Sequence, residues 1–86
     1  MPIKIYVKNS AKELDWLCND IWDLATQLDV LERWLTNKGQ RLSHDEYVAD
    51  IGFNSRSLSS GGGGVLSTNS MSIMSKIGMC IYFSEY

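Results

Sequence analysis

The chain has 86 residues, a formal net charge of −2 and a hydrophobic content of 44%, a composition typical of one folded domain. Its eight Lys and Arg residues form no dense basic cluster, so direct binding to nucleic acid phosphates is not expected. No stretch approaches the roughly 20 apolar residues of a membrane span, and the first residues lack the apolar run of a signal peptide, so we expect a cytoplasmic protein.

The first expected element is a strand over residues 3–7. Ile3, Ile5 and Val7 alternate with Lys4 and Tyr6, which is the period of a strand with one buried face.

The next segment has the pattern of one long amphipathic helix over residues 11–38. A capping box runs from Ser10 to Glu13, and Lys38 followed by Gly39 suits a helix end. Apolar residues recur every seven positions, at Leu14, Ile21, Leu28 and Leu35. Such a helix would be about 40 Å long. We expect it to pack across a sheet, and pairing between two chains is the alternative.

The second half of the chain contains weaker signals. A second capping box, Ser43 to Glu46, predicts a short helix over residues 44–50. A Gly/Ser loop over residues 54–64 follows, and strands are expected over residues 65–74 and 77–83. The predicted fold is therefore a small single α+β domain of order β-α-α-β-β. Its sheet has three mostly antiparallel strands and is packed by the long helix.

The sequence contains only weak matches to motifs that carry catalytic chemistry. Gly61–Gly64 lead into Val65 rather than the lysine and hydroxyl of a phosphate-binding loop. His44 is the only histidine. The neighbouring acids Asp45 and Glu46 are explained by their place at a predicted helix start, and no nucleophile–histidine arrangement can be singled out. Cys18 and Cys80 lack the spacing of a metal or redox pair and are expected to be reduced thiols. We therefore expect no enzyme activity, no cofactor and no metal.

The tryptophans point to a binding surface. All three lie within the predicted helix but outside its heptad positions, and six acids with no Lys or Arg fall between Glu13 and Glu32. Aromatic residues that the core does not use are often interface anchors, and acids beside them suit a basic protein patch. Burial of the rings beneath the C-terminal strands is the structural alternative. The predicted partner-binding residues are Trp16, Asp20, Trp22, Asp23, Gln27, Val30 and Trp34.

Three functions follow from these observations. We expect a non-enzymatic module that binds and inhibits a larger basic or nucleic-acid-processing protein, in the manner of phage anti-defence or toxin-immunity proteins. The first alternative is a homo-oligomeric structural module. The second is a ligand-binding or enzymatic domain that uses His44, Arg56 and the glycine loop.

Overall fold

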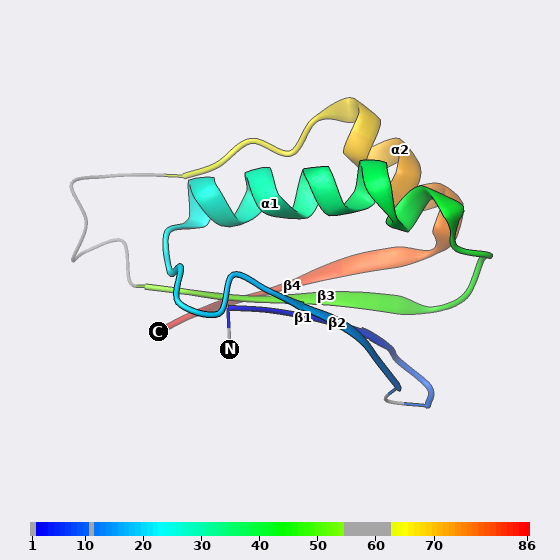
Figure 1. The fold of residues 1–86 in the computed structure, drawn as a ribbon, viewed down its shortest axis with the longest axis horizontal. Coiled ribbons are helices and arrows are strands. Elements are labelled where there is room, and N and C mark those ends of the chain that lie inside the picture. The colour runs from blue at the N-terminus through cyan, green and yellow to red at the C-terminus, as the bar shows by residue number, and fades with distance from the viewer. Residues whose placement is uncertain (1, 11, 55–62) are drawn as a thin grey trace.

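The computed structural model of the protein describes residues 2–10, 12–54 and 63–86. Its elements are, in chain order, β1 (Ile3–Val7), β2 (Lys12–Leu17), α1 (Leu24–Asn37), a 3₁₀ turn (Gly39–Arg41), β3 (Tyr47–Phe53), α2 (Thr68–Ile77) and β4 (Met79–Glu85). The strands form one sheet of order β2-β1-β3-β4, in which β1 is antiparallel to β2 and β3, and β3 is parallel to β4. Both helices lie on the same side of the sheet (Figure 1).

The core fills the space between the sheet and the two helices. Its fully buried members come from β1, β3 and both helices: Ile3, Ile5, Ala49, Ile51, Leu31, Leu35 and Ile77. Burial of one such side chain stabilises the folded state by about 1.5–3 kcal/mol. This single apolar layer therefore fixes both helices against one face of the sheet, and neither helix lies on the opposite face (Figure 1).

The prediction of a small α+β fold with one long helix against a sheet is confirmed, and so is the strand over residues 3–7. The predicted sheet is wrong in detail, because it has four strands and is mixed rather than mostly antiparallel. The observed order is β-β-α-β-α-β, not β-α-α-β-β.

The predicted helix over residues 11–38 is wrong in its first half. Lys12–Leu17 form β2, which pairs with β1, and Cys18 then adopts a left-handed φ of 56°. The helix starts only after Asp23, whose carboxylate accepts hydrogen bonds from the amide and the hydroxyl of Thr26. The capping box and the heptad favour a helix only through local interactions. Pairing with the edge of β1 prevails in this segment, because it supplies cross-strand hydrogen bonds to the backbone.

The predicted short helix over residues 44–50 is also wrong, because Tyr47–Phe53 form the strand β3. Six of its seven residues are buried, and it pairs with β1 on one side and β4 on the other. The Asp45 carboxylate accepts a hydrogen bond from the amide of Glu46, and the residues of the capping box form no helix. Central strands read as continuous apolar runs, which resemble short helices in sequence.

The predicted strand over residues 65–74 is replaced by α2. The Ser67 hydroxyl caps this helix at the amide of Ser70, and Gly78 ends it with a left-handed φ of 86°. The last expected strand, residues 77–83, corresponds to β4, but the helix before it makes β4 parallel to β3, whereas the predicted sheet is mostly antiparallel. Parallel neighbours require such a crossover.

Candidate functional site

The face of the sheet opposite the helices carries an ordered set of side chains. Odd-numbered residues of β1 and β3 lie in the core, so their even-numbered residues project to the other side. The strand register aligns these side chains in two rows that cross all four strands. The first row is Trp16, Lys4, Asp50 and Tyr82, and the second is Glu13, Tyr6, Val48 and Cys80. We call these eight residues the open face; one of them, Val48, is itself fully buried.

One end of the open face is organised around Lys4. Its ammonium lies 5.2 Å from the centroid of the Tyr6 ring, 5.5 Å from that of Trp16 and 3.5 Å from the Glu13 carboxylate. The indole of Trp16 donates a 2.9 Å hydrogen bond to Glu13. This hydrogen bond and the nearby Lys4 charge lower the pKa of Glu13. Trp16 is nevertheless 40% exposed, so its ring is held in position and still accessible.

The centre of the open face contains a partly buried carboxylate. Asp50 lies between Lys4 on β1 and Tyr82 on β4, and its Oδ1 atom is buried without a hydrogen-bond partner among the described residues. The neighbouring cation, Lys4, is engaged by Glu13. A buried acceptor without a donor costs about 1–3 kcal/mol. At the far end of the row, Tyr82 is 42% exposed.

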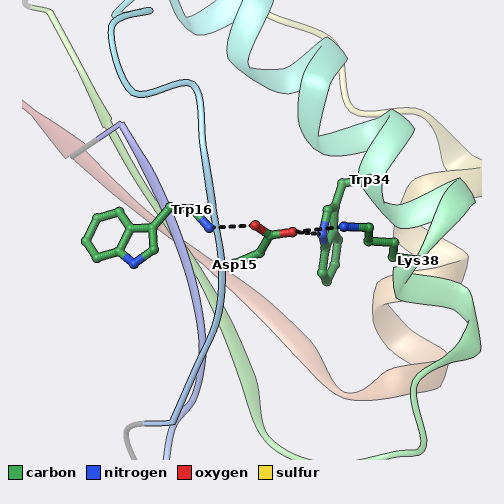
Figure 2. A network of polar contacts seen from close by, with 4 residues as sticks. All are labelled: Asp15, Trp16, Trp34 and Lys38. Carbon is green, nitrogen blue, oxygen red and sulfur yellow. Dashed lines mark hydrogen bonds and ion pairs between the residues drawn. The ribbon is translucent and has the colours of Figure 1, made fainter.

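Asp15 connects β2 to α1 and thereby orients the strand that carries Trp16. Its carboxylate accepts 2.9 Å hydrogen bonds from the indole of Trp34 and from the backbone amide of Trp16, and it lies 3.5 Å from the Lys38 ammonium. Figure 2 shows Trp34 and Lys38 on the helix side of Asp15, whereas the Trp16 ring points away from the helix. The two tryptophans therefore lie on opposite sides of the sheet.

The structure does not place the seven predicted partner-binding residues on one surface. Trp16 lies on the open face, whereas Trp34 is only 8% exposed and belongs to the core. Asp20 is exposed in the turn after β2, and Val30 is partly buried on α1. The expected shared face depended on one continuous helix, which the chain does not form.

The other three predicted residues have structural contacts. Trp22 is partly buried and packs edge-on against Tyr86, with ring centroids 5.6 Å apart. Asp23 is the N-cap of α1. Gln27 is fully buried and donates hydrogen bonds of 2.6 and 2.8 Å to the carbonyls of Ile21 and Gly52.

The remaining members of the open face were not predicted as site residues. Alternation within residues 3–7 already places Lys4 and Tyr6 on the face away from the core, and alternation within 77–83 does the same for Cys80 and Tyr82. Asp50 carried no such signal, because its segment was assigned to a helix.

A groove of about 480 Å³ lies between the two helices. Glu32 within it accepts hydrogen bonds from the amide of Ser67 and the hydroxyl of Ser70. This acid therefore stabilises the N-terminus of α2. The glycine-loop alternative cannot be placed, because Arg56 and most of the predicted loop lie outside the described residues. His44 is exposed.

No group of three or more His, Cys, Asp or Glu side chains among the described residues is arranged to hold a metal ion. None of the helices in the described part of the chain is long and apolar enough to cross a membrane. Comparison of the chain with protein-family models, with curated proteins and with solved structures found no match.

Proposed function

We propose that the protein is a non-enzymatic protein-binding module whose open face docks onto a basic surface of a larger protein. The observation that carries this proposal is the Asp50 carboxylate, whose buried Oδ1 has no partner among the described residues, in the same row as two exposed aromatic rings, Trp16 and Tyr82. Exposed aromatic residues around a polar contact are typical of interface centres.

The chemistry of the open face favours an arginine or lysine of the partner as the central contact. A guanidinium donates hydrogen bonds to a carboxylate, and its planar face packs against aromatic rings. Asp50 and Tyr82 are direct neighbours on β3 and β4, about 4.8 Å apart in the sheet, so one side chain can reach both. Lys4 is already paired with Glu13 and does not compete for Asp50.

Inhibition is the form of this function that we propose. A basic surface that binds nucleic acid depends on exposed Lys and Arg, and a protein that covers them blocks the substrate. This corresponds to the anti-defence or immunity role expected from the composition. The proposed surface differs from the one predicted from the sequence. Of the seven predicted partner-binding residues, Trp16 alone belongs to the open face.

The experiment is affinity capture from lysate with four baits: the wild type, Asp50→Asn, Trp16→Ala and the control Asp20→Asn. Asp20 is an exposed acid outside the open face, so its substitution changes the net charge in the same way as Asp50→Asn. Recovered proteins are identified by mass spectrometry, and their affinities for each variant are then measured with the purified partner at two salt concentrations.

The proposal predicts one basic protein that is retained by the wild type and Asp20→Asn and is lost or weakened with the other two baits. Binding should also weaken as salt increases. Equal recovery with all four baits, or a partner whose contact surface is not basic, would overturn the proposal.

A further inference from the structure

The two edges of the sheet differ in their suitability for pairing. β2 carries three charges in six residues (Lys12, Glu13 and Asp15), and its pairing with β1 contains a register shift. Charges and bulges are devices that prevent an edge strand from pairing with another chain. β4 has the sequence MCIYFSE, a single charge at Glu85 and an unbroken register with β3. The β4 edge therefore lacks the devices that protect β2.

The backbone of β4 has hydrogen-bonding groups directed away from β3. The Gly78 carbonyl accepts a hydrogen bond from the amide of Tyr47, and the Tyr86 amide donates one to the carbonyl of Phe53. Because alternate residues of a parallel strand bond to a given neighbour, the even-numbered residues of β4 face β3. The amides and carbonyls of the odd-numbered residues 81 and 83 point to the outer edge. Among the described residues, the sheet ends at β4.

The geometry points to a second copy of this chain as the occupant of that edge, with two β4 strands pairing antiparallel about a twofold axis at Tyr82. In this register Ile81 of each copy is opposite Phe83 of the other, an aromatic and β-branched pair of a kind that stabilises a sheet. Each Glu85 lies opposite Met79, so the two acids are kept at opposite ends of the seam. Phe83 is 57% exposed in the single chain, and the second copy covers it in this pairing.

Pairing through β4 also produces a closed assembly. The resulting eight-stranded sheet is bounded on both sides by β2, the charged and irregular edge, so a third copy finds no comparable strand. The two open faces become continuous, and the two Asp50 side chains are three strand spacings apart, about 14 Å. The pairing itself does not depend on the proposed partner and is tested without it.

The experiment is the molar mass of the purified protein in solution, measured by light scattering and sedimentation across a wide concentration range. We expect twice the 9.7 kDa mass of the chain. Phe83→Pro should be a monomer, because proline removes an amide hydrogen that points to the outer edge while leaving the bonds to β3, and edge strands tolerate it there. Phe83→Leu keeps the amide and should remain a dimer. Circular dichroism confirms that both variants fold.

A second pair of variants tests the register independently, also in case Phe83→Pro does not fold. Tyr82→Lys and Tyr82→Glu each place like charges opposite one another and should each weaken self-association by about fivefold. An equimolar mixture of the two should form the mixed dimer in preference to either parent. The inference is overturned if the wild type is monomeric at every concentration, if folded Phe83→Pro still dimerises, or if the charge variants associate without preference.

Discussion

Lys4 and Asp50 are direct cross-strand neighbours on β1 and β3, but the Lys4 ammonium lies 3.5 Å from Glu13 on β2. The same Glu13 accepts the indole hydrogen of Trp16, so one acid holds both the cation and the ring. Asp50 is consequently left with a buried oxygen that has no donor among the described residues. An arrangement that leaves a polar atom unsatisfied in the free protein is common at binding sites, where stability is reduced in favour of function.

Substitution of Asp50 by Asn should separate stability from binding. The amide has nearly the same shape but no charge, so the free energy of unfolding should stay unchanged or rise by up to about 1 kcal/mol. Affinity for a basic partner should fall by about tenfold or more, because a charged hydrogen bond is lost. Urea denaturation and titration with the captured partner measure the two quantities. A variant that is strongly destabilised would identify Asp50 as a structural residue instead.

Substitution of Asp15 by Ala should destabilise the protein by about 1–3 kcal/mol, because it leaves the buried indole N–H of Trp34 without its acceptor. Asp20→Ala is the matched control, since Asp20 is exposed, and it should change stability by less than about 0.5 kcal/mol. Urea denaturation followed by tryptophan fluorescence compares the variants. Equal stability of the two would show that the link between β2 and α1 contributes nothing.

Substitution of Gly78 by Ala should be among the more damaging changes. Gly78 ends α2 with a φ of 86°, and a Cβ there would collide with the backbone carbonyl of Asp45. The left-handed conformation alone costs a non-glycine residue about 1–2 kcal/mol, and the collision adds to it. Gly63→Ala is the control, because a Cβ at that position has nothing within 4 Å. Thermal unfolding should show a lower Tm for Gly78→Ala only.

The stability of the protein should decrease as the pH falls below about 4.5. Hydrogen bonds from Ser67 and Ser70 lower the pKa of Glu32 from its ordinary value of 4.5. A lowered pKa means that the unfolded chain binds the proton more readily, so this contribution is complete above pH 4.5 and is lost as the pH falls through the lowered value. Glu32→Gln should be less stable than the wild type at neutral pH and should lose less stability on acidification. Parallel pH dependence of the two proteins would contradict this role for Glu32.

How far the sequence predicts the fold differs from segment to segment. Alternation at Ile3, Ile5 and Val7 predicts β1 correctly, and the same period in residues 77–83 predicts β4 with the right inward and outward faces, apart from its exposed end at Phe83. These patterns are reliable because a half-buried strand requires every second residue to be apolar. The α+β class with one long helix is likewise contained in the sequence.

Tertiary structure determines the conformation of the segments in which local sequence favours a helix but neighbouring strands are available for pairing. Residues 12–17 carry a capping box and heptad positions, yet they pair with β1, because a strand edge offers backbone hydrogen bonds that a frayed helix end does not. Six of the seven residues of β3 are buried because this strand is central, and its sequence resembles a short helix for that reason.

The candidate site likewise depends on which segments become strands and pair with one another. Trp16, Lys4, Asp50 and Tyr82 are separated by as many as 78 positions in the chain, and only the order and register of the four strands bring them into one row. Local sequence determines which side of a strand each residue occupies. Which strands become neighbours depends on burial of the apolar layer beneath the two helices, and that is a property of the folded chain.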